Sequence, residues 1–138
     1  MPAIASAIQP DGERYEENKA DMLSLIGRLR ALEGRTRAAS NKRRATFEKR
    51  NQIPPHERLE RLIDPGMPFL RLHSMANYCV ENPDPEHSIP GASTIAGIGF
   101  VNGVRCMLWV DDSGIAAGAA TTSTVDVALS IQQICMRQ

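Results

Sequence analysis

The sequence predicts a mixed α/β fold in which a helical amino-terminal segment is followed by a β-hairpin and a crossover helix. Apolar residues at three- and four-residue spacing within residues 16–32 are typical of an amphipathic helix. Two apolar runs joined by Asn102-Gly103 are typical of a β-hairpin, because both central positions of a type I′ turn need φ > 0. Helical spacing returns near the carboxyl end, after a loop of small residues.

Length and composition limit the class of protein. The chain has 138 residues and 42% hydrophobic residues, enough to bury a core. Its formal net charge is zero, which excludes a uniformly basic nucleic-acid coat and an acidic tail. Near the amino terminus there is no basic n-region and too little apolar length for a secretion signal or a membrane span. Three widely spaced cysteines without a CxxC pair indicate a reducing compartment, so we expect a cytoplasmic protein with no membrane association.

The helical segment is expected at residues 16–64, after a flexible arm at 1–15. Its first helix should bury one apolar stripe, and Gly34 should weaken or interrupt that helix. The stripe consists of Met22, Leu25, Ile26, Leu29 and Leu32.

A basic stretch follows between residues 35 and 50, opposed only by Glu48. It has no strong apolar stripe, so it is either a solvated helix or a segment that needs a partner, such as another protein, a nucleic acid or the 3′-phosphate of coenzyme A. Its basic residues are Arg35, Arg37, Lys42, Arg43, Arg44, Lys49 and Arg50.

A second short helix should begin at Pro55, which suits the first helical turn. It carries the apolar residues Leu59, Leu62 and Ile63. The following "DPG", residues 64–66, predicts a tight turn, and "PFLRL", residues 68–72, predicts an extended segment.

The clearest local structure is the predicted hairpin, which comes after a proline-rich loop at residues 81–92. On its second strand the residues alternate between two faces. One face holds Val104, Cys106, Leu108 and Val110, and the other holds Arg105, Met107 and Trp109.

After the hairpin, a glycine- and alanine-rich loop leads to a last helix. Ser123 and Asp126 have the spacing of a capping box at its start. The apolar residues of this helix are Val125, Leu129, Ile131 and Ile134.

Several of these segments together resemble a known family. They are "LIDPGMPFLRLHSMA", the Ile89-Pro90-Gly91-Ala92 sequence, "IAGIGFVNGVRCMLWVDDS" and "LSIQQI". In this order they resemble the amino-terminal region of the carboxyltransferase (β) subunits of biotin-dependent acyl-CoA carboxylases, over roughly residues 20–138. The pattern "DPGxPFLxL" is more similar to the methylcrotonyl-CoA and geranyl-CoA carboxylases than to the propionyl-CoA type.

The resemblance implies a crotonase-like fold of repeated strand-strand-helix units, in which a carboxyl group moves from carboxybiotin to an acyl-CoA. Such subunits are several times longer, and their oxyanion-hole loops follow the helix at which this sequence stops. Residues 65–138 would then form an incomplete crotonase-like carboxyltransferase domain, and we expect the chain to be inactive alone. Gln138 falls in a continuing helical pattern, which favours the front portion of a subunit. A gene remnant, a proteolytic product and an engineered piece all fit this expectation.

Within this resemblance, the site-bearing segment is the loop Ala116, Ala117, Gly118 and Ala119. Small residues let backbone N–H groups approach an acyl-CoA thioester without a side chain in the way. Most of the family has Lys-Gly-Gly where this chain has Ala116-Ala117-Gly118, which puts a direct phosphate or biotin contact in doubt. Alternatively, the small residues only let a helix pack on the hairpin.

The remaining polar residues indicate no catalytic residue and no metal site. Asp111 and Asp112 end a strand, where a turn explains them better than a general base does. We expect Trp109 in the core or at an interface. The histidines, which lack metal-ligand spacing, are His56, His73 and His87.

The resemblance also implies partners and a cofactor. Biotin would be carried on a partner, a biotin carboxylase or biotin carrier subunit, and none would be bound directly by this chain. The expected partners are an acyl-CoA, that subunit, the rest of the carboxyltransferase subunit and further copies in a homo-oligomer. The alternative is an interaction module whose basic helix binds nucleic acid or a protein.

Overall fold

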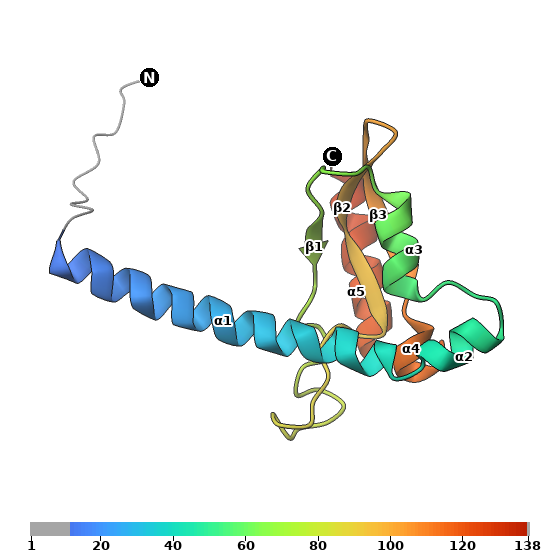
Figure 1. Ribbon diagram of the computed structural model, residues 1–138, viewed down its shortest axis with the longest axis horizontal. Helices are drawn as coiled ribbons and strands as arrows, with labels where there is room; N and C mark the ends of the chain where they lie inside the picture. Colours follow the sequence, from blue (N-terminus) through green and yellow to red (C-terminus); the bar gives the residue numbers. More distant parts are fainter. Residues whose placement is uncertain (1–11, 138) are drawn as a thin grey trace. The chain divides into compact units, whose positions relative to one another are not determined.

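The computed structural model describes residues 12–137 and has the mixed helix-and-sheet architecture that the sequence predicts (Figure 1). Most of the predicted flexible arm, residues 1–11, lies outside the described residues. The chain divides into two compact units, Met1–Ala31 and Leu32–Gln138. The elements are α1 Glu13–Asn41, α2 Arg44–Lys49, α3 Pro55–Leu62, β1 Leu70–Leu72, β2 Thr94–Val101, β3 Val104–Asp111, α4 Ser113–Ala116 and α5 Thr122–Met136.

Helix α1 continues through Gly34, so the predicted interruption is wrong. A glycine costs about 1 kcal/mol in a helix interior, which favourable contacts elsewhere can offset. Beyond Gly34, the Thr36 hydroxyl donates to the carbonyl of Pro90 at 2.7 Å, and the Ser40 hydroxyl donates to the carboxylate of Asp112 at 2.7 Å. These distant contacts stabilise the last turns of α1.

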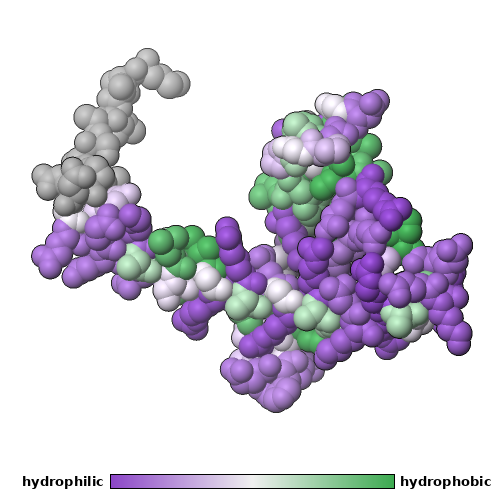
Figure 2. All heavy atoms as spheres, in the orientation of Figure 1, coloured by the Kyte–Doolittle hydropathy of each residue, from purple (hydrophilic) through white to green (hydrophobic). Residues whose placement is uncertain are grey.

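The apolar stripe of α1 is exposed, not buried as predicted. Met22, Leu25 and Leu29 are 56%, 55% and 42% exposed. Figure 2 shows hydrophobic side chains on the surface of this helix. The described part of the unit Met1–Ala31 is essentially a single helix, and a single helix has no second element in its own unit to cover an apolar face.

The β-hairpin forms as predicted. Asn102 and Gly103 have φ of 51° and 77°, and the two strands pair from Thr94 opposite Asp111 to Val101 opposite Val104. The predicted extended segment becomes β1, which pairs antiparallel with β2 and gives the sheet order β1-β2-β3.

The predicted "DPG" turn is also present, and it meets the hairpin turn. The amide of Met67 donates to the carbonyl of Asp64 at 3.2 Å, and Gly66 has φ of 77°. In addition, the Asp64 carboxylate accepts from the amides of Asn102 and Gly103, both at 2.7 Å. One side chain therefore holds two turns together.

The sheet is covered on both faces, by α3 on one and α5 on the other (Figure 1). Leu108 and Val110 share one face and Met107 lies with the other, as the predicted alternation requires. One core cluster contains Leu59, Ile95, Leu108 and Val110. The other contains Ala92, Ala96, Val127 and Ile131.

The predicted start of the last helix is wrong by two residues. The N-cap of α5 is Thr121, and its capping box partner is Thr124 rather than Asp126. The buried face of α5 consists of Ser123, Val127 and Ile131, while Val125 and Leu129 are exposed. Threonine hydroxyls at positions 121 and 124 satisfy the free amides that the helix start leaves.

Candidate functional site: the small-residue loop and its pocket

The small-residue loop, residues 113–120, follows β3 and contains the short helix α4. Asp112 is the N-cap of α4, and its side chain accepts a hydrogen bond from the amide of Gly114. After α4, Ala117 and Gly118 are both left-handed, with φ of 52° and 85°. Their conformation turns the chain sharply before α5 begins.

A pocket of about 240 Å³ lies between this loop and residues 77–93. Ile115 and Ala116 form one wall, and Asn77, Ser88 and Ser93 belong to the other. Of the four residues predicted to contact acyl-CoA, only Ala116 lines this pocket. Ala117, Gly118 and Ala119 follow it in the chain and are exposed.

The opposite wall contains a strained backbone that the sequence analysis missed. Gly91, Ala92 and Ser93 have φ of 101°, 49° and 58°, and all three are buried. Left-handed geometry costs about 1–2 kcal/mol for a residue with a Cβ, so surrounding contacts must impose it. Ala92 and Ser93 accept hydrogen bonds through their carbonyls, from the Thr124 hydroxyl at 2.6 Å and the Asp112 amide at 2.8 Å. In the sequence, the run of small residues between Pro90 and β2 could have indicated this unusual backbone.

Neutral polar groups dominate the chemistry of the pocket. Ser88 accepts from the amide of Cys79 at 2.8 Å, and the Ser123 hydroxyl donates to the Asn77 side chain at 3.2 Å. The ionisable residues Glu81 and His87 are exposed. Among the described residues of this pocket we find no nucleophile hydrogen-bonded to a base, so the arrangement favours binding over covalent catalysis.

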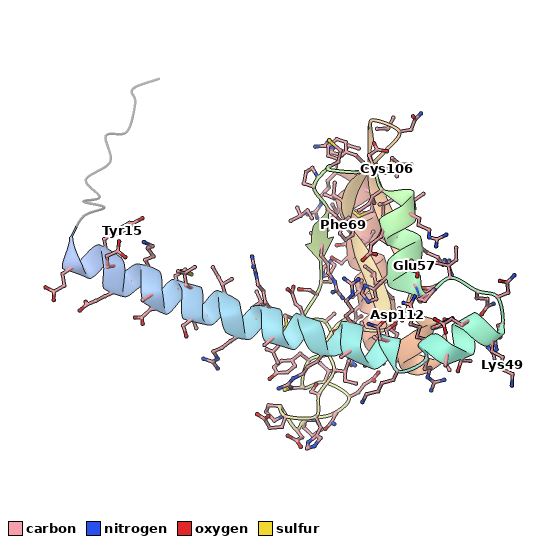
Figure 3. The ribbon with its side chains drawn as sticks, in the orientation of Figure 1. Tyr15, Lys49, Glu57, Phe69, Cys106 and Asp112 are labelled. Atoms are coloured by element: carbon pink, nitrogen blue, oxygen red, sulfur yellow. The ribbon has the colours of Figure 1, made fainter. Side chains whose placement is uncertain are left out.

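Asp112 has a different environment from its neighbour Asp111. Asp111 is exposed and accepts from the indole Nε1 of Trp109 at 2.7 Å. Asp112 has no exposed surface and lies where α1, α3 and α4 meet (Figure 3). Its Oδ2 is 3.5 Å from Nε2 of His56. Only Asp112 therefore acts as the turn-forming residue that the sequence predicted for both.

His87 and the basic segment have ordinary surface partners. His87 contacts Asp84 at 2.5 Å, and its hydrogen bond to that carboxylate lowers the pKa of Asp84. Arg37 pairs with Glu60 at 2.6 Å, and Arg44 pairs with Glu48 and Glu57 at 3.0 and 3.3 Å. Part of the basic segment is thus neutralised within the chain.

Residues 12–137 contain no cluster of three or more histidine, cysteine, aspartate or glutamate side chains placed to hold a metal ion. Over the same residues, no helix is long and apolar enough to cross a membrane.

Curated relatives are similar to nearly the whole chain. The methylcrotonoyl-CoA carboxylase beta chain of Arabidopsis thaliana is 31% identical over 94% of this chain and 22% of its own length. A probable biotin-dependent acyl-coenzyme A carboxylase beta2 subunit of Mycobacterium tuberculosis is 30% identical over 95% of this chain and 24% of its own. The chain therefore spans about a quarter of the length of these relatives.

Solved structures have the same fold. The beta subunit of geranyl-CoA carboxylase from P. aeruginosa matches 98% of this chain and 25% of its own, with a TM-score of 0.86 and 38% identity. The transcarboxylase 12S crystal structure matches 78% of this chain and 22% of its own, with a TM-score of 0.61 and 16% identity, a likeness of fold alone. These matches confirm the predicted crotonase-like architecture and the resemblance to carboxylase β subunits.

The carboxyl transferase domain family matches residues 48–138, which include the sheet, the small-residue loop and all of α5. The match covers about two thirds of the sequence. The chain belongs to the carboxyl transferase domain family.

Proposed function

We propose that this chain forms part of a subunit that transfers a carboxyl group from carboxybiotin to an acyl-CoA. The family match and the named activities of the relatives support this assignment. Carboxybiotin, held by a biotin carboxylase or biotin carrier subunit, supplies the activated carboxyl group. The residues of this chain are assigned to the acceptor, the acyl-CoA.

The observation that carries the acyl-CoA assignment is the shared pocket of Ala116 and Ser93. Ala116 and Ser93 are small residues on opposite sides of this pocket, so a ligand can approach the backbone closely at these two positions. Neutral polar side chains beside them suit the amide and thioester groups of an acylated pantetheine arm. We assign Ala116, Ala117, Gly118 and Ala119 to one side of that arm, as binding residues and not as catalytic ones.

The side chains of this loop offer biotin no polar partner. Residues 115–120 are all apolar or glycine, so they present neither a hydrogen-bonding side chain nor a positive charge to its ureido ring. The family's lysine is also replaced here by Ala116 in "AAG". We therefore assign no direct biotin contact to this loop.

To test this assignment, the affinity for 3-methylcrotonoyl-CoA is measured with the chain and with a full-length subunit that contains it. Gly118→Val adds a branched side chain beside the proposed ligand and strains a φ of 85°, so it should weaken binding at least tenfold. Ala116→Ser changes little bulk and should alter the affinity by less than about threefold. The matched control is Gly103→Val, which strains a φ of 77° in the hairpin turn, where the surroundings are open. Equal affinities in the Gly118 variant and wild type would refute the acyl-CoA assignment.

The proposal extends to activity and assembly. The chain alone should transfer no carboxyl group, because one missing oxyanion donor costs a factor of about 10² to 10³ and the expected donors lie in the rest of the subunit. Carboxylation by the purified chain would contradict this. Homo-oligomerisation and a cytoplasmic location are further parts of the proposal. The exposed apolar residues of α5 and the three free cysteines support them.

The alternative is an interaction module whose basic helix binds nucleic acid or a protein partner. None of the reported relatives supports it, and the ion pairs of Arg37 and Arg44 reduce the charge available to a polyanion.

A further inference from the structure

Asp112 is the most completely buried ionisable group of the described chain that has a defined hydrogen-bond network. Its Oδ1 accepts from the Ser40 hydroxyl at 2.7 Å and from the Gly114 amide at 3.1 Å. Its Oδ2 lies 3.5 Å from Nε2 of His56, whose side chain is 13% exposed. Oδ2 has no hydrogen-bond partner. Its own amide donates to the carbonyl of Ser93 at 2.8 Å. A single residue thus contacts α1, α3, α4 and the strained wall of the pocket.

Burying a carboxylate is expensive, and an apolar residue of similar size is often equally stable. The Asp112 network is therefore poorly explained as a source of stability alone. Nor does it present a nucleophile to a substrate, because Ser40 and Asp112 are both buried. What the network does provide is a fixed position for α4.

The packing around Gly114 restricts α4 in the same way. A Cβ on Gly114 would lie 2.5 Å from Oγ of Ser40 and 2.9 Å from its Cα and carbonyl oxygen. The backbone of α4 therefore touches α1, and the contact leaves no space for a side chain. Two residues after Gly114 comes Ala116, which lines the pocket.

The charge balance of the network includes Arg71 on β1. Nε and Nη2 of Arg71 are buried without a hydrogen-bond partner. Burial lowers the pKa of this guanidinium, while the nearby carboxylates of Glu33 and Asp112 raise it. The positive charge of Arg71 therefore compensates part of the Asp112 charge, and the imidazole of His56 lies 3.5 Å from Oδ2.

We infer that Asp112, with Ser40 and His56, is a positioning residue for the small-residue loop, whose backbone it aligns for acyl-CoA. Oδ1 fixes the first turn of α4, and the Asp112 amide ties the loop to Ser93 on the other side of the pocket. Loss of the carboxylate charge should loosen residues 113–118 without unfolding the hairpin. The inference rests on the proposed function for its ligand, but the alignment of the loop is measurable without a ligand.

The experiment compares Asp112→Asn with the matched control Asp111→Asn in the full chain. Amide hydrogen exchange is measured at residues 113–118 and in the hairpin, and the affinity for 3-methylcrotonoyl-CoA is titrated. Asparagine keeps an acceptor oxygen for Ser40 and Gly114 but removes the charge that strengthens both hydrogen bonds, which corresponds to roughly a tenfold change in an equilibrium constant. Asp112→Asn should therefore raise exchange in the loop at least tenfold, leave the hairpin unchanged and weaken acyl-CoA binding about tenfold. Asp111→Asn should change none of these.

Ser40→Ala is the second variant, in case Asp112→Asn does not fold. It removes one donor to the same carboxylate and should raise exchange at Gly114 by a smaller factor, with little further increase in the double variant. Uniformly faster exchange through loop and hairpin, or unchanged exchange in the loop, would overturn the inference. If wild-type chain and subunit both fail to bind the acyl-CoA, the proposed function fails, and the exchange pattern alone decides whether Asp112 positions the loop.

Discussion

Two segments of this chain each contain a pair of consecutive left-handed residues, and they are encoded in different ways. Asn102 and Gly103 have φ of 51° and 77°, and Ala117 and Gly118 have φ of 52° and 85°. In the hairpin turn both residue types tolerate this geometry, whereas after α4 an alanine must adopt it. The first turn consists of residue types that adopt this geometry readily. The second follows α4, whose N-cap Asp112 is held by Ser40 from a distant part of the sequence.

An aspartate accompanies each of these turns, and the two differ in burial. Asp64, half-buried, accepts from the amides of Asn102 and Gly103. Asp112, fully buried, begins α4 and accepts from Ser40, which is 72 residues away. The comparison predicts that the second turn depends more strongly on its surroundings.

The largest effect is expected from Gly114→Ala. Its Cβ would lie 2.9 Å from the backbone of Ser40, so α4 must move away from α1. Overpacking of this kind costs about 3 kcal/mol in the free energy of unfolding, measured by urea denaturation. The control is Gly34→Ala, also in a helix but with open space around the new Cβ, which should be neutral or stabilising. Equal stabilities of the two variants would show that the α1–α4 contact is not tight.

Asp64→Ala should have the next largest effect, on the hairpin turn. It removes the acceptor of two backbone hydrogen bonds, and we expect a loss of about 2 kcal/mol in the free energy of unfolding. Amide resonances of Asn102 and Gly103 should shift, while those of residues 113–118 stay in place. Asp126→Ala, an exposed substitution on α5, should change the stability by less than about 0.5 kcal/mol. An unperturbed hairpin turn in the Asp64 variant would mean that Asn102-Gly103 suffices alone.

Ala117→Gly should have a smaller effect of the opposite sign. Glycine relieves the left-handed strain at this position, which should stabilise the chain by about 1 kcal/mol. In the hairpin turn, Asn102→Ala creates the same strain and should cost a similar amount. Thermal unfolding of both variants checks the pair. A destabilised Ala117→Gly variant would indicate that the alanine side chain makes a contact worth more than the strain.

The same contrast explains what the sequence could predict of the fold. The hairpin, the "DPG" turn, Pro55 at a helix start and the alternation along β3 all follow from neighbouring residues, and all were confirmed. The continuation of α1 past Gly34 could not be predicted, because the groups that stabilise it, Pro90 and Asp112, are 54 and 72 residues away from their partners.

The candidate site was predictable only in part, for a related reason. Ala116 was found because small residues in a run permit close backbone approach. The left-handed backbone of Ser93 was missed because the residue is not a glycine. The burial of Asp112 was missed because the sequence does not distinguish it from its exposed neighbour Asp111. Side-chain type alone does not distinguish a buried aspartate from an exposed one.

An aspartate also holds a third turn, and this aspartate, Asp84, is exposed. Asp84 accepts from the amide of Glu86 through Oδ1 at 2.9 Å and contacts His87 Nδ1 through Oδ2. An ionised carboxylate can only accept, so the imidazole nitrogen is the donor. The hydrogen bond from His87 is the largest cause that lowers the pKa of Asp84, followed by the Glu86 amide.

The smallest expected effect is therefore a pH dependence of this turn. A lowered carboxyl pKa stabilises the folded turn above the ordinary pKa of aspartate, and the contribution is lost as the pH falls through the lowered value. NMR titration of the Asp84 carboxyl should give a midpoint below that of an ordinary aspartate, and His87→Ala should raise it. Asp84→Asn should remove the acid dependence of the Glu86 amide shift. If Asp84 titrates at the same pH with and without His87, solvent screens the contact between them. In that case only Asp64 and Asp112, whose side chains are less exposed, hold their turns by charge.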